Sequence, residues 1–417
     1  MRIQTILNHV EKQPRFVYGA TTLKRTGGLA GVHIHMRPKQ GCKPICSGCG
    51  QCRPAYDRLD ERHFRYLPML ATLAVFLVYR LRRCDCPRCG VTVEMVPWAS
   101  GKSPITHALG WYVSSWAKVL PWQEVARQFH VSWGVVFDAV AMAVQWGLQH
   151  RSLDNIVAIG VDELSRRRGQ VYFTMVYQID HGCRRLLWIG RDRTAATFDR
   201  FFDELGARSA SIRFVASDMW KAFLSVVRKR APSAVHVLDR FHVTKLAGEA
   251  VDQVRRDEAR GLRGQKHQPL KHTRWLLLKN PKNLSKTEGC RLRDLMRLNL
   301  RTVRAYVLQD ILRGFWDVNS PRKAREFLTN WCYSAARSRL DPFRRLADTL
   351  REHHTLLLNW FKARDAFAKG ATEGFNNKAR VVTRRSYGFR NERIAEIALF
   401  HALGKLPVPD WVTHRFG

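Results

Sequence analysis

The stretch Ile156–Glu163, which reads IVAIGVDE, is the first of five strand candidates and ends in two carboxylates. An apolar run of this length, bounded by polar residues, is typical of a strand. The other four candidates follow before residue 245: Val171–Ile179, Arg185–Arg191, Ile212–Ser217 and Ala234–Leu238. Helical patterns separate the last three of the five strands, over Ala195–Leu205 and Trp220–Lys229. Three consecutive strands followed by αβαβ is the order of an RNase H-like α/β core.

Two aspartates stand at the ends of these apolar runs. Asp162 ends the sequence AIGVD, and Asp218 ends the sequence FVASD. If the two strands are neighbours in one sheet, both carboxylates converge at the same edge and can bind Mg²⁺, a hard cation that prefers oxygen ligands. Each aspartate taken singly is also explained as a solvated strand terminus. Glu163 is expected to face the opposite side of the strand from Asp162.

A third carboxylate must come from elsewhere in the chain, and Glu373 is the candidate. It opens a helical pattern rich in polar and basic residues. Glu373, Asn377, Arg380 and Arg384 recur at helical spacing and therefore share one face. That face would present one metal ligand followed by phosphate-binding groups. Two metal ions about 3.5–4 Å apart can activate a nucleophile and stabilise the leaving oxygen of an in-line displacement.

The sequence Asp239-Arg240-Phe241-His242 closes the fifth strand candidate. Its carboxylate, guanidinium and imidazole could act near the site. They could equally form a hydrogen-bonded end to the strand, and the sequence leaves the two readings open.

The cysteines are concentrated near the N-terminus. Cys46-Ser-Gly-Cys49 and Cys86-Pro-Arg-Cys89 are two CxxC pairs, each followed by Gly. Two such turns can close a tetrahedral Zn²⁺ site, and four thiolates leave no open position, so the predicted zinc is structural. A reduced, metal-free cluster is the alternative. The choice of ligands is open, because Cys52 forms a further CxxC with Cys49, and Cys42 and Cys84 are close by.

A helix-turn-helix is predicted after this cysteine-rich region. Trp122–Phe129 reads as one short helix, and Ser132 can cap a second helix over Trp133–Gly147. The start of the second helix, Trp133–Asp138, would then lie across a DNA major groove. Two packed helices without a role in DNA binding are the alternative.

The order of these patterns predicts a multidomain α+β protein. From Thr244 to about Ala368 the periodicity is helical throughout, which predicts an all-helical insertion in the core. The expected domains are a zinc-binding domain over 1–100, a helix-turn-helix domain over 101–152, the first part of the RNase H-like catalytic core over 153–243, the insertion over 244–368, and the C-terminal helical part of the core, with Glu373, over 369–417.

The charge balance points to nucleic acid as the partner. Lys and Arg total 71 against 35 Asp and Glu, which gives a net charge of +36 at pH 7. A surface so positive repels itself unless it meets a polyanion. The longest apolar run, Leu67–Tyr79, is shorter than the ~18–20 residues of a membrane-spanning helix and predicts a buried strand instead. With no signal-peptide pattern at its start, the chain is expected in the cytoplasm, associated with the nucleoid and without membrane contact.

Four motifs resemble those of the DDE transposases of the bacterial ISL-three insertion-sequence family. They are GVDE at Gly160–Glu163, VASDM at Val215–Met219, DRFHV at Asp239–Val243, and EGFNNK at Glu373–Lys378 with YGFRN at Tyr387–Asn391. The order of a zinc finger, a helix-turn-helix and a catalytic core is also similar. The likeness extends over roughly Cys46 to Leu403.

This resemblance implies an acidic triad that binds two divalent metal ions, Mg²⁺ or Mn²⁺, and by motif position the triad falls on Asp162, Asp218 and Glu373. It also implies N-terminal modules that recognise the terminal inverted repeats of the element. The expected function is therefore a transposase that hydrolyses the phosphodiester at the element ends and joins the 3′-OH ends to target DNA.

The expected partner is double-stranded DNA, and a homodimer or larger assembly is expected because two ends must be brought together. The expected DNA contacts are Ser132, Trp133, Asn377, Lys378, Arg380, Arg384, Arg385 and Arg390. Two alternatives remain open at this point. One is a sequence-specific DNA-binding regulator with an inactive core, and the other is an RNase H-like nuclease that cuts without joining.

Overall fold

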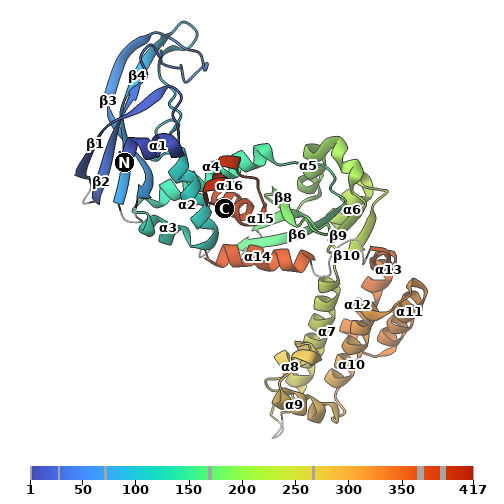
Figure 1. Ribbon diagram of the computed structural model, residues 1–417. Helices are drawn as coiled ribbons and strands as arrows, with labels where there is room; N and C mark the ends of the chain where they lie inside the picture. The colour runs from blue at the N-terminus through green and yellow to red at the C-terminus, as the bar shows by residue number, and fades with distance from the viewer. Residues whose placement is uncertain are drawn as a thin grey trace. The chain divides into compact units, whose positions relative to one another are not determined.

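The computed structural model describes residues 2–26, 29–69, 73–167, 171–264, 268–363, 371–385 and 391–416 (Figure 1). Within these ranges the side chains of residues 26, 29, 166–167, 171, 371–373, 376, 385 and 414–416 are left out of the description. The chain forms two compact units. Unit 1 comprises Met1–Arg151, Arg393–Ala402 and Leu406–Gly417, and unit 2 comprises Ser152–Glu392 and Leu403–Lys405.

The first part of unit 1 is a five-stranded sheet with the helix α1 (Ile3–Val10) against its first strand. Its strands are β1 (Phe16–Thr26), β2 (Leu29–Pro38), β3 (Ala55–Met69), β4 (Leu73–Cys86) and β5 (Gly90–Val93). They are arranged in the order β1-β2-β4-β3, and β5 also pairs with β4. Ile34, Phe64, Leu77 and Trp98 are buried together at the centre of its core.

The apolar run Leu67–Tyr79 is not one strand, as its sequence predicts, but contributes to two. It contains the end of β3 and the beginning of β4, and Met69 pairs with Leu73 across the antiparallel ladder. The prediction was wrong because both strands are apolar where they meet, so the change of direction leaves no polar break in the sequence.

Helices form the rest of unit 1. They are α2 (His107–Val119), α3 (Trp122–Gln128), α4 (Trp133–His150), the Arg393–Ala402 part of α15 (Glu392–Leu403), and α16 (Asp410–Phe416). The predicted pair of helices and the Ser132 cap are confirmed, because the Ser132 hydroxyl accepts a hydrogen bond from the backbone N–H of Val135. His130 in the turn between α3 and α4 has φ 47°, the left-handed conformation in which Gly is usual.

Among the described residues, no single helix is long and apolar enough to cross a membrane. The helices α3 and α4 meet the length and hydropathy requirement only when they are counted together, and they are bent by 113° relative to each other.

Unit 2 is built on a second five-stranded sheet. Its strands are β6 (Ala158–Arg167), β7 (Val171–Gln178), β8 (Arg185–Gly190), β9 (Phe214–Ser217) and β10 (Val235–Leu238), in the order β10-β9-β6-β7-β8. The five predicted strands are confirmed. β6, β7 and β8 form an antiparallel meander, whereas β9 pairs in parallel with both β6 and β10.

Helices cover both faces of this sheet. On one face, α5 (Ala195–Leu205) and α6 (Lys221–Arg230) bury Phe198, Phe202 and Phe223 against Val161 and Val215. On the opposite face, α14 (Ala371–Arg385) contacts β6, and its Phe375 stacks on Tyr177 of β7 with a ring-centroid distance of 4.5 Å. Because side chains alternate along a strand, Asp162 lies on the face opposite Val161, the face that α14 contacts.

Helices fill the chain between β10 and α14. They are α7 (Arg240–Gly261), α8 (Arg274–Leu278), α9 (Lys286–Met296), α10 (Arg301–Arg313), α11 (Pro321–Arg337), α12 (Asp341–Glu352) and α13 (His354–Ala363), with 3₁₀ turns at Pro281–Asn283 and Gly314–Asp317. As predicted, the described residues of this region contain no strand. The group has its own core around Ala305, Phe315 and Leu350, and α13 packs on β10.

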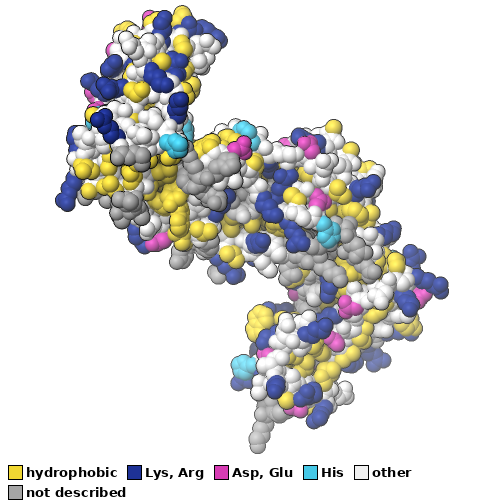
Figure 2. All heavy atoms as spheres, in the orientation of Figure 1, with side chains coloured by type: hydrophobic (Ala, Val, Ile, Leu, Met, Phe, Trp, Pro, Cys, Tyr) yellow, Lys and Arg dark blue, Asp and Glu magenta, His cyan; other side chains and the backbone are white. Residues whose placement is uncertain are grey.

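Basic side chains are widely distributed rather than gathered in one tail. Lys and Arg side chains are spread over the visible surface of the molecule in Figure 2, with few acidic side chains between them. This distribution is the one expected of a protein that contacts a polyanion over a broad surface.

Candidate functional site

Three aspartates occupy equivalent positions on three neighbouring parallel strands of unit 2. Gly160 of β6 pairs with Ala216 of β9, which in turn pairs with Val237 of β10. Asp162, Asp218 and Asp239 each lie two residues beyond those partners. Because residues in register on parallel strands point to the same face, the three carboxylates share one face of the sheet at its carboxyl edge.

The position of Asp162 differs from the sequence prediction in one respect. β6 continues to Arg167, so Asp162 lies inside the strand rather than at its end, and only 4% of its surface is exposed. Asp218 follows the last residue of β9, as predicted. Asp239 follows β10 and caps α7, where its carboxylate accepts a hydrogen bond of 2.9 Å from the backbone N–H of Phe241.

His242 completes a cluster with two of these aspartates. One potential ligand atom from each of Asp162, Asp239 and His242 lies within 4.8 Å of the others. The His242 Nδ1 atom is 3.7 Å from a carboxylate oxygen of Asp239. The structure therefore assigns Asp239 and His242, which the sequence left open, to the same cluster as Asp162.

The charges of this cluster act on one another. Burial raises the pKa of Asp218 above its usual value. Burial and the nearby charge of Asp218 raise the pKa of Glu163. Burial lowers the pKa of His242, but the carboxylates of Asp239, Asp162 and Asp218 outweigh burial and raise it overall. Buried carboxylates that repel one another in this way favour a bound cation.

Arg193 connects Glu163 to the aromatic side chains beside the cluster. Its guanidinium lies 3.4 Å from the Glu163 carboxylate and over the rings of Tyr172 and Trp220, at 4.3 and 4.7 Å. The indole N–H of Trp220 donates a 3.0 Å hydrogen bond to the Arg193 carbonyl. Alternation along the strand predicts that Glu163 faces away from Asp162, yet its carboxylate is close enough to Asp218 and His242 for their charges to alter its pKa.

The helix α14, which contacts the Asp162 side of the sheet, carries several exposed polar residues. Asn377, Lys378, Arg380 and Arg384 are exposed, whereas Phe375 and Ala379 are buried. The charges of both Asp162 and Arg380 influence the pKa of the buried Tyr177 hydroxyl, which burial raises well above its usual value. Glu373 lies in α14, but its side chain is outside the described residues, as are the side chain of Arg385 and the whole of Arg390.

Comparisons with known proteins agree with this geometry. Residues 159–397 match the sequence profile of a transposase family, the ISL3 (ISL-three) DDE transposases. That match includes the whole aspartate cluster and α14. The chain belongs to the ISL3 family of DDE transposases. Membership implies that catalysis uses divalent metal ions, and it makes this transposase an enzyme that acts on DNA.

Relatives resemble the transposase over nearly its full length. The transposase for insertion sequence element IS1557 of Mycobacterium tuberculosis (strain CDC 1551 / Oshkosh) is 31% identical, with 91% of this chain and 90% of the relative covered. The transposase for insertion sequence element IS1001 of Bordetella parapertussis is 31% identical, with 87% and 89% covered. Among solved structures, the Drosophila P element transposase strand transfer complex is similar, with a TM-score of 0.40 and 9% sequence identity. The alignment covers 75% of this chain and 94% of the chain in that complex.

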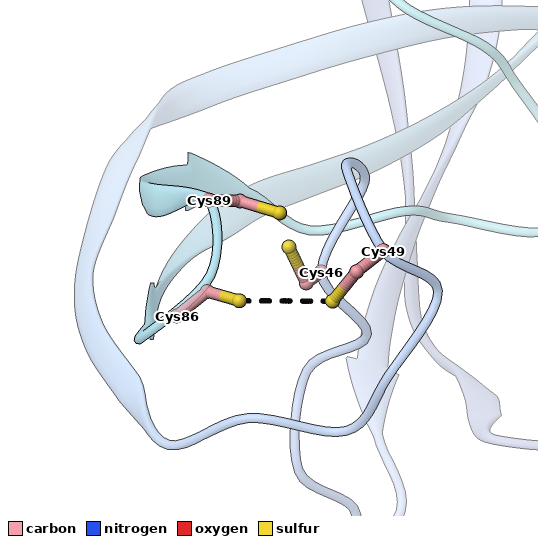
Figure 3. A group of neighbouring side chains, drawn as sticks. All are labelled: Cys46, Cys49, Cys86 and Cys89. Carbon is pink, nitrogen blue, oxygen red and sulfur yellow. Dashed lines mark hydrogen bonds between the residues drawn. The ribbon is translucent and has the colours of Figure 1, made fainter.

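In unit 1 of the transposase, four of the clustered cysteines converge as predicted. One sulfur atom from each of Cys46, Cys49, Cys86 and Cys89 lies within 4.8 Å of the other three (Figure 3). The Cys49 and Cys86 sulfurs are 3.6 Å apart. A hydrogen bond with the Thr92 hydroxyl contributes most to lowering the pKa of Cys46 to about 6, which favours the thiolate that a metal requires. Four converging thiolates fit a tetrahedral structural ion.

Close packing at Gly48 and a buried hydrogen-bond network hold the two cysteine turns together. A Cβ atom at Gly48 would lie 2.9 Å from the Cys89 sulfur, so a larger residue there would separate the turns. Glu94 pairs with Cys46 in a β-bridge, and its buried carboxylate accepts three hydrogen bonds from the Arg82 guanidinium, at 2.7, 3.0 and 3.1 Å, and one from the Tyr79 hydroxyl. Arg82 also donates to the Cys42 carbonyl at 2.8 Å. This network ties the loop that carries Cys46 to β4.

The two predicted helix-turn-helix contacts have different surroundings. The Ser132 hydroxyl is used as the cap of α4. Trp133 is 38% exposed and stacks on Phe137, with 5.8 Å between ring centroids. The role of both residues in DNA binding stays a prediction.

Sequence reasoning left Asp239 and His242 undecided and did not identify Arg193. The signal for the first two was present, because the sequence DRFH follows a predicted strand in the same way that Asp218 follows its strand. Arg193 follows β8 and is recognisable only from the fold that brings it to Glu163.

Proposed function

We propose that this transposase binds the terminal inverted repeats of its element, cuts the phosphodiester at each end and joins the resulting 3′-OH to target DNA. The observation that carries the proposal is the equivalent placement of Asp162, Asp218 and Asp239 on one sheet edge, with the helix α14 against β6 on the same face as Asp162. The family and its two insertion-sequence relatives support the same reaction.

The core of unit 2 is, in this proposal, RNase H-like. Its support is the strand order β10-β9-β6-β7-β8, in which an antiparallel meander of three strands is extended by two parallel ones. The insertion of α7–α13 between β10 and α14 then accounts for the long separation in sequence between Asp218 and Glu373.

The donor set fits hard divalent cations, Mg²⁺ or Mn²⁺. Asp162, Asp218 and Glu373 would hold two such ions, and Asp239 and His242 stand beside them. When bound, these ions lower the pKa of an attacking water and offset the charge on the leaving oxygen.

The protein side chains then position the DNA. The exposed side chains of Lys378, Arg380 and Arg384 on α14 would hold backbone phosphates near the cut, together with Arg385 and Arg390 from the sequence that follows. Contacts of this kind fix the register of the DNA without reading its sequence. Arg193 would keep Glu163 in place beside Asp218, because its guanidinium is held by Tyr172 and Trp220.

Unit 1 is proposed to recognise the element ends. The Cys46, Cys49, Cys86 and Cys89 cluster would bind a structural Zn²⁺, and α3 and α4 would act as a helix-turn-helix with Trp133 at the groove. Each end of the element requires one copy of unit 1 to recognise it, so we propose that the transposase acts as a homodimer or larger assembly.

The test is a cleavage and joining assay with the full chain. The DNA flanking the gene would supply labelled duplex ends, with Mg²⁺ or Mn²⁺ and a supercoiled target plasmid. Wild type is compared with Glu373→Gln, which keeps the shape and removes the charge. We expect metal-dependent cutting and joining, with both lost in Glu373→Gln.

The control is Glu352→Gln, at the exposed end of α12, which should behave as wild type. Tight binding of the flanks with no cutting by the wild type would support a regulator with an inactive core. Cutting without joining would support a nuclease. Either result would overturn the proposal.

A further inference from the structure

The helical insertion contains a large groove that begins beside the aspartate cluster. It has a volume of about 990 Å³ and lies between α7, α8, α10 and α12. Phe241, the residue before His242, lines its near end, and Arg256 lines it further along α7. These residues are fifteen apart, so the groove follows about 22 Å of helix at 1.5 Å per residue. That length accommodates several nucleotides.

The groove is basic. Lys245, Arg255, Arg256, Arg274 and Arg345 line it, against the two acids Glu249 and Asp252. Asp252 is buried and draws three guanidinium groups together, with Arg255 at 2.7 Å and both Arg256 and Arg274 at 3.5 Å. The side chains of Arg256 and Arg274 remain 52% and 55% exposed. Guanidinium groups fixed in place yet exposed are suited to bind phosphates.

An aromatic side chain stands over this basic surface. Trp275 lines the groove, is 67% exposed, and has the Arg274 guanidinium 5.1 Å from its ring. A flat ring next to phosphate-binding groups is the arrangement on which an unpaired base stacks.

A buried amide lies in the same groove. Gln309 is 2% exposed, and its side-chain oxygen has no hydrogen-bond partner among the described residues. A Cβ atom at Gly248 would lie 3.4 Å from its side-chain nitrogen, so the glycine leaves space beside the amide. A side-chain amide carries both N–H donors and an oxygen acceptor, and a base edge presents the complementary groups.

We propose that this groove binds unpaired nucleotides of the DNA next to the cleavage site, with Trp275 stacked on a base and Arg256, Arg274 and Arg345 on the phosphates. The proposal rests on the proposed function in one respect, namely that DNA is cut at the adjacent aspartate cluster. It adds a class of ligand, a single-stranded flank, and a site for it outside the catalytic carboxylates.

The test is a binding measurement with the full chain and no added divalent metal, so that no cutting occurs. The probes are a blunt duplex of the element end and the same duplex with a four-thymine single-stranded flank. Stacking contributes about 1–3 kcal/mol per base, so we expect the flank to improve affinity at least fivefold in the wild type. Trp275→Ala should abolish that gain and leave blunt-duplex affinity within twofold.

Tyr333→Ala is the matched control. Tyr333 belongs to α11 of the same insertion, is 53% exposed, and has the Arg337 guanidinium 3.9 Å from its ring, but it does not line the groove. It should retain the full preference for the flank, and Trp275→Phe should retain most of it. Because Trp275 is so exposed, the thermal unfolding of Trp275→Ala should match wild type.

Two results would overturn the proposal. One is equal affinity of the wild type for both probes, or a preference that survives Trp275→Ala. The other is a change of oligomeric mass in Trp275→Ala, measured by sedimentation, without any change in flank binding, which would make the groove a contact between copies of the chain. Failure of cutting and joining in the earlier assay would leave the binding result intact, so the two proposals fail separately.

Discussion

The cysteine cluster of unit 1 and the aspartate cluster of unit 2 are built in opposite ways. Each pair of cysteines is set by a local turn, and only the two pairs must be brought together. The aspartates are 56 and 21 residues apart in sequence and meet only because three parallel strands share one register. A site of the first kind is encoded by spacing, whereas a site of the second kind is encoded by the sheet.

The two clusters also differ in how their charges are supported. The Thr92 hydroxyl forms a hydrogen bond with the Cys46 sulfur, and Arg82, which is paired with Glu94, donates to the Cys42 carbonyl. The carboxylates of unit 2 face one another, and burial keeps the pKa values of Asp218 and Glu163 raised. The hydrogen bonds around the cysteines stabilise the fold of unit 1, whereas the closely spaced carboxylates of unit 2 favour the binding of a cation.

The largest expected effect concerns the proposed structural zinc. Cys86→Ser should remove the bound zinc and destabilise the cysteine turns severely, because structural zinc sites contribute on the order of 10 kcal/mol. Metal content per chain and thermal unfolding measure both effects. Cys52→Ser is the control, since Cys52 is exposed and outside the group. If the two variants lost zinc equally, a different set of four ligands would be required.

The next effect concerns the carboxylates. Asp162→Asn should reduce strand cleavage by about 10³-fold or more, because several kcal/mol of charge stabilisation depend on the metal ions it would hold. Zinc content should not change. Asp348→Asn, which alters a 73% exposed carboxylate on α12, should cleave at the wild-type rate. An Asp162→Asn enzyme of normal activity would remove Asp162 from the site.

A third prediction concerns the support of the cysteine cluster. Glu94→Gln should destabilise unit 1 by about 3 kcal/mol, because it leaves the buried Arg82 guanidinium without its counter-charge. Denaturant unfolding measures the change, and Glu124→Gln is the control, since Glu124 forms an exposed pair with Arg127 on α3. Equal stability of the two variants would mean that Arg82 is compensated by other groups.

The smallest effect is expected from the phosphate contacts of α14. Arg384→Ala should weaken binding to all DNA sequences alike and lower the salt dependence of binding by about one unit of slope. Titrations at several salt concentrations, with specific and random duplexes, measure it. Arg322→Ala, on a 90% exposed residue of α11, should keep the wild-type slope. A loss confined to one sequence would instead make Arg384 a base-reading residue.

Much of this architecture could be predicted from the sequence, because the spacing of hydrophobic residues follows the period of a helix or a strand in most regular elements. The helix Ala195–Leu205 has the predicted bounds, and Ser132 caps α4 as its position indicates. The division of Leu67–Tyr79 between the antiparallel strands β3 and β4 could not be predicted, because the run is apolar both where β3 ends and where β4 begins. The length of β6 was also missed, since its second half is polar and reads as a loop.

The two candidate sites also differ in how far they could be predicted from the sequence. The four converging cysteines follow from their spacing. The sequence shows that Asp239 and His242 follow a strand, but their position beside Asp162 depends on the pairing of β10 with β9 and of β9 with β6. Nothing in the sequence around Arg193 indicates that its guanidinium reaches Glu163.

The C-terminal segments of the chain complete unit 1. Ile397 and Phe400 pack against the core of α2, α3 and α4, and Gly147 of α4 leaves the space that Leu406 occupies, since a Cβ there would lie 2.6 Å from it. Roughly 240 residues of unit 2 are therefore translated between the two parts of unit 1. Because translation adds about 5–20 residues per second, the C-terminal helices of unit 1 are made tens of seconds after its N-terminal part. A prematurely terminated polypeptide would carry an incomplete unit 1, so translation errors late in the gene would affect the first part of the protein to be made.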